Sequence, residues 1–365
     1  MKDTDYGRYQ DNFIKNKDIE SILITGSPND IKSPQFSIVI PTYKRPEYLR
    51  EAIMSALAQE GCRPDYEVLV VDNEETDENT ESGTEALVRT VQDKRLLYYR
   101  NSKNLGMCGN WNRCIELARS RWVVFLHDDD LLLKDCLYRL NNYIEKYDTD
   151  ECPLGYIKSE VLTFGGKKAK ENTGGFVYKI KKRLRKLNSN KLVKINKKDI
   201  IIRGEAGFLG APTCGTLINK EAMFQVGGYN ERYYPSFDTY PPYFMLGRYG
   251  VYKSVDYLGA YRWESNQSFK EDTLYSWVEE YESFRKYLSV SEPLLARKAD
   301  WFIEEQYAVF VDWVVGIGKR AGKDISCKDF NHVREYNPGK YKKIIYNKYK
   351  LIRWHLKLLG SMVIK

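Results

Sequence analysis

Short apolar runs alternate with amphipathic stretches between residues 36 and 146 of the chain. Each apolar run has the length and composition of a buried strand, and each stretch that follows has helical spacing. Strands that alternate with helices are typical of right-handed βαβ units and predict a mostly parallel central sheet flanked by helices. The predicted strands are 36–40, 67–71, 96–99 and 121–127, and the predicted helices are 46–59, 84–93, 107–119 and 134–146.

This alternation ends after residue 150. Residues 153–164 and 255–261 have the character of further strands, and apolar residues at intervals of three or four predict a helix over 271–318. Residues 1–34 are polar and have no regular pattern. We therefore expect them to form a loosely packed N-terminal tail.

Polar side chains follow three of the predicted strands. Thr42-Tyr43, Asp72-Asn73 and the acidic triplet Asp128-Asp129-Asp130 each come directly after an apolar run. The carboxyl ends of parallel strands meet at one edge of a sheet, where ligands bind, so these groups should converge on one crevice. Adjacent carboxylates suit Mg²⁺ or Mn²⁺ together with a diphosphate. The alternative interpretation of the triplet is a polar turn that caps the next helix.

Positive charge is concentrated in two segments of a chain whose net charge is +8. Residues 178–199 hold ten Lys or Arg and one acid, and residues 336–365 hold eight Lys or Arg and no acid. The first segment is predicted to be an exposed basic insertion. Nucleic acid and an anionic membrane surface are both possible partners for such segments. We expect no nucleic acid, because the segments lack interleaved aromatic residues and a known reading motif.

Residues 341–363 have apolar positions on one helical face and Lys and Arg on the other. A basic amphipathic helix that contains a Trp, here Trp354, predicts peripheral contact with a membrane surface. A terminal helix packed on the protein body is the alternative.

The cysteine and histidine content argues against several classes of site. The seven Cys form no CxxC pair, which is typical of reduced thiols in a cytoplasmic protein, and three His make a His-rich zinc site improbable. No apolar run has transmembrane length, and the first residues lack a secretion signal. We expect a cytoplasmic location, at the inner face of the plasma membrane.

Three motifs together resemble those of family-2 glycosyltransferases. They are Ser37–Arg45, Asn104–Asn112 and the acidic triplet, which occur in the order and spacing of that family. The resemblance covers roughly residues 35–265. It implies an α/β glycosyltransferase-A (nucleotide-diphospho-sugar transferase) fold and inverting transfer of a sugar with Mn²⁺ or Mg²⁺. The implied organisation is a tail over 1–34, a catalytic domain over 35–268 with the basic insertion 178–199, and a helical C-terminal region over 269–365.

The resemblance also implies roles for individual residues on the donor side. Asp72 would accept a hydrogen bond from the base, and Asp128 would lie by the ribose. Asp129 would be the main metal ligand, with Asp128 and Asp130 in support and Glu264 as a further ligand or an idle exposed residue. The implied nucleotide-sugar-binding residues are Thr42, Tyr43, Arg45, Asp72, Asn104, Asp128 and Arg262.

The general base expected from the resemblance is Asp238, which follows the Gly227-Gly228-Tyr229 turn. Asp238 as a helix cap is the alternative, and Glu231 is a second candidate base. The chain departs from the family pattern at two places. His127 stands where the triplet usually begins with an acid, and Phe237 stands where Glu is usual.

The function implied is transfer of a sugar to a saccharide or lipid-linked saccharide in cell-surface polysaccharide assembly. UDP is the default nucleotide, and dTDP presents the same N–H to Asp72. A non-catalytic nucleotide-sugar-binding protein of the same fold is one alternative. A sugar-1-phosphate nucleotidyltransferase is another, but residues 41–46 lack the Gly-rich loop that it needs.

Overall fold

The computed structural model divides into two compact units, a sheet unit (8–197 and 207–264) and a helical unit (1–7, 198–206 and 265–365). The residues that it describes are 9–61, 65–76, 80–165, 191–197, 200, 212–263, 270–293 and 303–326.

The sheet unit is built on one ten-stranded sheet. Its strands are β1 (Ser21–Thr25), β2 (Phe36–Thr42), β3 (Tyr66–Asp72), β4 (Leu96–Asn101), β5 (Trp122–Phe125), β6 (Leu131–Leu132), β7 (Leu154–Phe164), β8 (Leu192–Lys194), β9 (Thr216–Asn219) and β10 (Gly250–Arg262).

The sheet is mixed rather than mostly parallel. Its strand order is β1-β4-β3-β2-β5-β9-β7-β10-β6, with β8 also paired to β10. Parallel pairing joins β4, β3, β2 and β5 in a row, and also joins β7 to β10. The βαβ pattern ends after β5, because β9 runs antiparallel to both β5 and β7. The prediction of parallel strands is therefore correct for β2 to β5 and wrong for the sheet as a whole.

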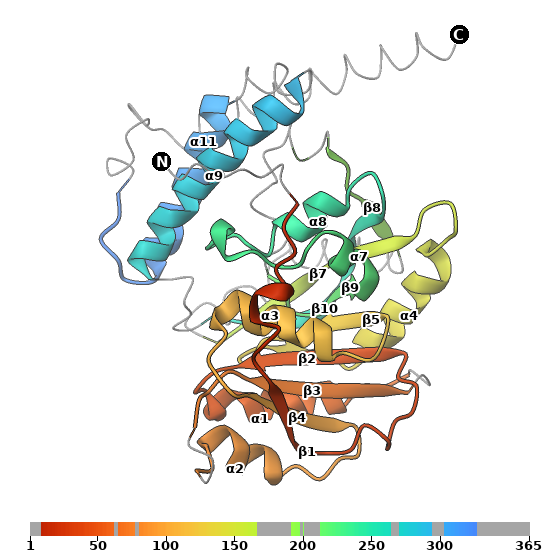
Figure 1. Cartoon of the computed structure of the whole chain (residues 1–365). Helices are drawn as coiled ribbons and strands as arrows, with labels where there is room; N and C mark the ends of the chain where they lie inside the picture. Colours follow the sequence, from red (N-terminus) through yellow and green to blue (C-terminus); the bar gives the residue numbers. More distant parts are fainter. Residues whose placement is uncertain are drawn as a thin grey trace, which may run out of the picture. The chain divides into compact units, whose positions relative to one another are not determined.

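Helices cover both faces of the central strands, which explains why β2, β3 and β5 are buried at every position. Ile38 and Ile40 face the core that contains Leu49 and Ile53, whereas α3 lies on the opposite face with Trp111. Figure 1 shows α3 in front of the sheet and α1 behind it. The helices of this unit are η1 (Ile14–Asn16), α1 (Pro46–Leu57), α2 (Gly83–Arg89), α3 (Gly106–Leu117), α4 (Cys136–Tyr147), α7 (Lys220–Gln225), η3 (Glu231–Tyr233) and α8 (Tyr240–Met245).

Residues 9–34 are part of the packed unit, so the expected loose tail is wrong for this stretch. Strand β1 pairs antiparallel with β4, with Ser21 opposite Asn101, at one end of the sheet. The backbone hydrogen bonds of an edge strand compensate for its half-exposed, weakly patterned side chains.

The helical unit contains α9 (Glu271–Ser291) and α11 (Ile303–Arg320). The Tyr281 and Phe310 rings stack at 4.3 Å between centroids and join the two helices. The single helix predicted over 271–318 is interrupted, because Pro293 disfavours a helical conformation in the residue before it. None of the described helices combines the length and apolar composition needed to cross a bilayer.

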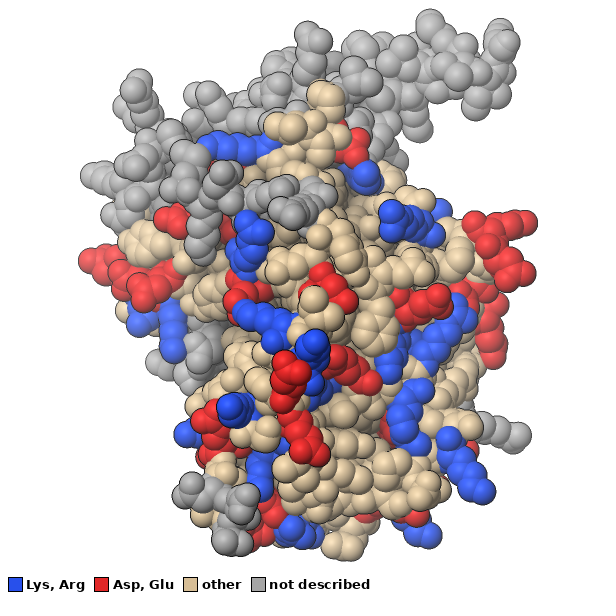
Figure 2. All heavy atoms as spheres, viewed as in Figure 1, with Lys and Arg blue, Asp and Glu red and all other residues tan. Residues whose placement is uncertain are grey.

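Charges of both signs are mixed on the described surface. Figure 2 shows acidic and basic side chains interspersed over one face. Of the basic insertion the structure describes residues 191–197, and the basic segment 336–365 lies outside the described residues.

An ion pair between a buried carboxylate and a partly exposed arginine ties the central strands to the end of α3. The Glu67 carboxylate on β3 is fully buried and accepts hydrogen bonds from Ser37 Oγ at 2.6 Å and Arg119 Nε at 2.6 Å. Loss of one partner leaves a buried charge uncompensated, which costs far more than loss of an exposed pair.

We predict that Arg119→Ala lowers the free energy of unfolding by about 2 kcal/mol, because the buried Glu67 carboxylate loses a charged hydrogen-bond partner. Urea denaturation followed by circular dichroism measures this change. Lys134→Ala, which breaks the exposed Lys134–Glu60 pair, is the matched control and should have little effect. Equal destabilisation by the two variants would contradict the assigned role of Glu67.

Candidate active site

Three strand ends meet at one edge of the sheet, as predicted. Thr42 and Asp72 are paired in register, and the Asn73 N–H donates to Thr42 O at 3.0 Å. The Thr42 hydroxyl donates to Asp128 Oδ2 at 2.9 Å. The ends of β2 and β3 and the turn after β5 therefore form one polar surface.

Two arginines hold the acidic triplet. Arg45 donates to Asp128 at 3.3 Å and to Asp129 at 2.8 Å. The Arg262 backbone N–H donates to Asp130 Oδ1 and its Nε donates to Asp129 O, both at 2.8 Å. The three acids are 6%, 7% and 1% exposed. These contacts offset the repulsion among carboxylates that have lost most of their water.

Burial also raises the pKa of two of these acids. It raises the pKa of Asp128 to about 7 and the pKa of Asp130 to about 8, against the lowering effect of Arg45 and Arg262 respectively. Asp130 Oδ2 is buried and has no hydrogen-bond partner among the described residues. A hard cation beside these oxygens would satisfy it and stabilise the ionised forms.

The donor set fits a cation that also takes ligands from a substrate. Within the described part of the chain, no three His, Cys, Asp or Glu side chains are grouped as metal ligands. Mg²⁺ and Mn²⁺ need no such cage, since one or two carboxylates with diphosphate oxygens and water suffice. Glu264, the further ligand expected from the sequence, lies outside the described residues.

Arg262 is enclosed by protein groups. Its Nη2 donates to Glu51 at 2.7 Å, and its guanidinium lies 4.7 Å from the Tyr48 ring and 4.5 Å from the Phe164 ring. These contacts orient the guanidinium toward the acidic turn. They favour a role in holding Asp129 and Asp130 over the direct diphosphate contact expected from the sequence.

Asp72, the acid expected to contact the nucleotide base, is fully buried. It accepts hydrogen bonds from Tyr98 Oη and the Glu74 N–H, both at 2.9 Å. Burial raises its pKa to about 6, and the two hydrogen bonds limit the rise. Tyr43 is 45% exposed next to Thr42 and is therefore accessible to a ligand.

The side-chain oxygen of Asn104 is hydrogen-bonded to protein groups rather than left free to contact a nucleotide. This oxygen accepts hydrogen bonds from Asn73 Nδ2 and the Gly106 N–H, both at 2.8 Å. Asn104 thus shapes the loop before α3, and the Leu105 backbone N–H of this loop donates to Asn73, the residue after Asp72, at 2.8 Å.

His127 is partly buried just beyond the end of β5, and desolvation lowers the pKa of its imidazole. Its Nε2 is hydrogen-bonded to Thr213 Oγ1, and its ring lies 4.9 Å from that of Trp111. Neither Thr213 nor Glu51 was expected in the site. No local pattern marks them, because they lie 86 residues from His127 and 211 residues from Arg262.

Asp238 directly follows a residue that packs against the Trp111 indole. Phe237, the preceding residue, packs edge-on against this indole at 4.9 Å. Burial raises the pKa of Asp238 to about 6, and the charge of Lys158 opposes the rise. Helix α8 begins at Tyr240 with Thr239 as its N-cap residue, so Asp238 does not occupy the capping position.

Glu231, the second candidate base, has an exposed side chain that pairs with Lys15. It is a weaker candidate, because an exposed and paired carboxylate resembles an ordinary surface acid.

Comparison with known proteins agrees with this geometry. Residues 37–203 match the model of the family described as Glycosyl transferase family 2. The match confirms the predicted family resemblance, and the sheet flanked by helices is the glycosyltransferase-A-like α/β fold expected from it.

Curated relatives are similar over about a third of the chain. The abequosyltransferase RfbV of Salmonella typhimurium is 37% identical over 112 residues, 30% of this chain and 32% of that protein. The GalNAc(5)-diNAcBac-PP-undecaprenol beta-1,3-glucosyltransferase of Campylobacter jejuni is 34% identical over 110 residues, 29% of this chain and 33% of that protein. The matched region thus spans about a third of the length of these relatives.

Solved structures show a more distant likeness. TarS of S. aureus in complex with UDP-GlcNAc has a TM-score of 0.49 at 14% identity, over 79% of this chain and 89% of that one. The mannosyltransferase PcManGT of Pyrobaculum calidifontis, in complex with GDP-Man and Mn²⁺, has a TM-score of 0.48 at 15% identity, over 92% and 90%.

We predict that Asp72 gives the ligand-free protein a defined pH dependence of stability. Burial raises the folded pKa of Asp72 from 3.8 to about 6. The folded protein therefore binds a proton at Asp72 more tightly than the unfolded chain does. The stability gained from this proton is fully present below the unfolded pKa and is lost as the pH rises through about 6. Relative to Asp72→Asn, the wild type should lose about 2 kcal/mol of unfolding free energy between about pH 4.5 and pH 8.

Urea titrations of both proteins at the two pH values measure this difference. Asp93→Asn is the control, because Arg95 lowers the pKa of Asp93 and this acid stays ionised over nearly the whole range. A difference between wild type and Asp72→Asn that does not vary with pH would contradict the buried, proton-binding state of Asp72.

Proposed function

We propose that this chain, whose residues 37–203 belong to glycosyl transferase family 2, is a metal-dependent inverting glycosyltransferase. It moves a sugar from a nucleotide diphosphate donor to a saccharide or lipid-linked saccharide acceptor in cell-surface polysaccharide assembly. One observation carries the proposal: Asp72 and the acidic triplet share one sheet edge, and the residues that precede the triplet and Asp238, His127 and Phe237, both pack against the Trp111 indole.

The donor nucleotide is proposed to bind along the ends of β2 and β3. The ionised Asp72 accepts a hydrogen bond from the N–H of a uracil or thymine ring, which makes UDP the first choice and dTDP the second. Tyr43 and Thr42 border the nucleotide, and Asp128 lies toward the ribose. The loop shaped by Asn104 closes this side.

The diphosphate is proposed to lie over the acidic triplet. Asp129 is the main ligand for Mn²⁺ or Mg²⁺, and Asp130 supports it. The cation supplies Lewis-acid stabilisation of charge on the diphosphate oxygens. Arg45 already places a positive charge against Asp128 and Asp129, and Arg262 keeps the turn in place.

Asp238 is proposed as the general base. Its carboxylate takes the proton of the acceptor hydroxyl as that oxygen attacks the anomeric carbon from the face opposite the leaving diphosphate. A pKa of about 6 suits this role, because the group is ionised near neutral pH and remains a better proton acceptor than an ordinary aspartate.

The acceptor and the location are proposed from the relatives and the sequence. The name of the Campylobacter jejuni relative describes a lipid-linked substrate, which supports an acceptor of this class. A basic amphipathic helix over 341–363 would bring the enzyme to the inner face of the plasma membrane. That segment lies outside the described residues.

Removal of the main metal ligand tests the donor site. We predict that Asp129→Ala abolishes the strengthening of UDP binding by Mn²⁺, because the cation loses its protein anchor. Isothermal titration calorimetry of UDP with and without Mn²⁺ measures this. Asp30→Ala, at an exposed acid of the same unit, is the control. If Mn²⁺ strengthens UDP binding to Asp129→Ala as much as to the wild type, the metal site has been misplaced.

Removal of the base tests the chemistry. We predict that Asp238→Asn binds UDP normally but lowers the rate of sugar transfer by about 100-fold or more, because the amide cannot take the hydroxyl proton. Transfer assays over a panel of nucleotide sugars, with calorimetry of UDP, separate the two effects. Glu231→Gln should keep near-normal rates. The reverse outcome, with Glu231→Gln inactive and Asp238→Asn active, would assign the base to Glu231.

A further inference from the structure

The N-terminal strap, residues 9–25, precedes the region that matches the family model, 37–203. Figure 1 shows this dark red segment passing over α3 before it joins the sheet as β1. It contacts the Gly227–Tyr229 turn directly, and it is linked to the loop after β3 through Asn101 on β4.

At its first end the strap holds the Gly227–Tyr229 turn. The Asn12 backbone N–H and side-chain Nδ2 both donate to Gly227 O, at 3.0 and 2.8 Å, and Asn12 is buried. A Cβ atom at Gly227 would lie 2.1 Å from Gln10 O, and one at Gly228 would lie 2.8 Å from the Phe13 ring. The strap thus approaches so closely that only glycine fits at both positions.

This turn is connected to the segment that carries the proposed base. Asn112 on α3 binds the Tyr229 backbone through two hydrogen bonds, at 2.8 and 2.9 Å. The Tyr229 ring contacts the Phe237 ring edge-on at 5.8 Å, and Phe237 directly precedes Asp238. A displacement of the turn would therefore be transmitted to Asp238.

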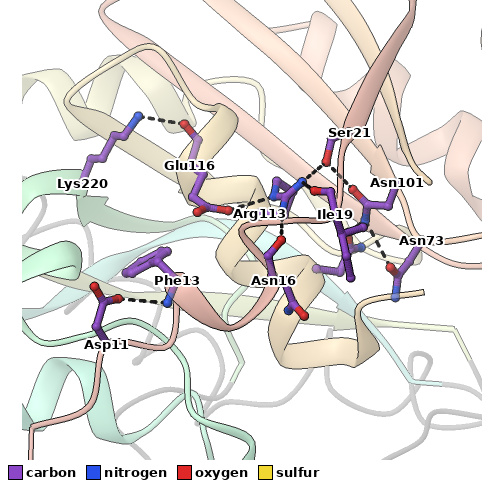
Figure 3. Close-up of polar contacts among 11 residues, drawn as sticks. Asp11, Phe13, Asn16, Ile19, Ser21, Asn73, Asn101, Arg113, Glu116 and Lys220 are labelled. Carbon is purple, nitrogen blue, oxygen red and sulfur yellow. Dashed lines mark hydrogen bonds and ion pairs between the residues drawn. The ribbon is translucent and has the colours of Figure 1, made fainter. Parts of the chain in front are cut away.

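At its second end the strap is fastened to α3 by Arg113. The guanidinium of Arg113 is buried and donates to Asn16 O at 2.9 Å and Ile19 O at 2.8 Å, and it also contacts Ser21 Oγ. Figure 3 shows Arg113 among these three strap residues, with Glu116 as its ion-pair partner. A cation surrounded by strap acceptors fixes the strap backbone against α3.

From Ser21 a chain of hydrogen bonds continues to the nucleotide side. Ser21 Oγ donates to Asn101 at 2.6 Å, Asn101 Nδ2 donates to Asn73 at 3.1 Å, and Asn73 Nδ2 donates to Asn104 at 2.8 Å. Figure 3 shows the part of this chain from Ser21 to Asn73. Asn73 directly follows Asp72, so the strap is linked to the loop proposed to border the base.

We propose that the strap sets the position of the base-bearing segment relative to the nucleotide loop, with Asn12 and Ser21 as positioning residues. The inference rests on the proposed function, since it assigns these residues to the reaction of Asp238 and to donor binding near Asp72. Asn12 affects the rate of the sugar-transfer step, and Ser21 affects binding of the donor.

Two substitutions test these separate effects in the full chain. Asn12→Asp keeps the shape of the side chain but replaces the donor to Gly227 O by a carboxylate oxygen. It should lower kcat for sugar transfer about tenfold and leave the donor KM within about twofold. Ser21→Ala should raise the donor KM about threefold with a smaller change in kcat, and Ser21→Thr, which keeps the hydroxyl, should restore it.

Lys17→Gln is the matched control, because Lys17 lies on the strap with an exposed side chain that has no hydrogen bond or ion pair within the described structure. It should behave as the wild type. If Asn12→Asp and Ser21→Ala change kcat and KM no more than Lys17→Gln does, the positioning role is overturned.

Hydrogen exchange gives a measurement that needs no activity. In Asn12→Asp, peptides covering 227–238 should exchange several-fold faster than in Lys17→Gln, while strand β3 exchanges as before. Equal exchange in the two variants, or faster exchange throughout the protein, would overturn the inference. A wild type that transfers no sugar would refute the proposed function and leave the strap to be judged by this exchange pattern.

Discussion

The constraint on which the site depends is the loss of water around three consecutive carboxylates at the end of β5. Charges so close and so buried need compensation from groups that are themselves held in place. Arg45 comes from the end of β2, and Arg262 comes from the end of β10. Strand β6, immediately after the triplet, pairs with β10 and so places Arg262 beside the acids.

The same loss of water explains why several protein groups hold the arginine side chain that faces the triplet. Glu51 and the rings of Tyr48 and Phe164 surround the Arg262 guanidinium, which limits the entropy lost when it binds the turn. Compensation remains incomplete, since Asp130 Oδ2 lacks a partner within the described residues. This arrangement is consistent with the proposed cation, which would need no complete cage of protein ligands.

Local patterns in the sequence were sufficient to predict the central strands and the polar groups at their ends. An apolar run followed by Thr42, Asp72 or Asp128 needs no long-range information. The contacts that complete the site do need it: Arg262 with Glu51, and Asn12 with Gly227, join residues 211 and 215 positions apart. Strand β1 was missed for a related reason, because its order comes from hydrogen bonds with β4 rather than from its own pattern.

The two departures from the family pattern have one physical cause in this structure. His127 and Phe237 replace acids of the pattern, and both rings lie 4.9 Å from the indole of Trp111. A carboxylate at either position would be buried against an aromatic surface, where ionisation is strongly disfavoured. With Phe237 in place of Glu, Asp238 is the acid that remains in the base motif expected from the family. The aromatic cluster therefore offers a physical reason for the altered motifs, and burial raises the pKa of Asp238, the proposed base, to about 6.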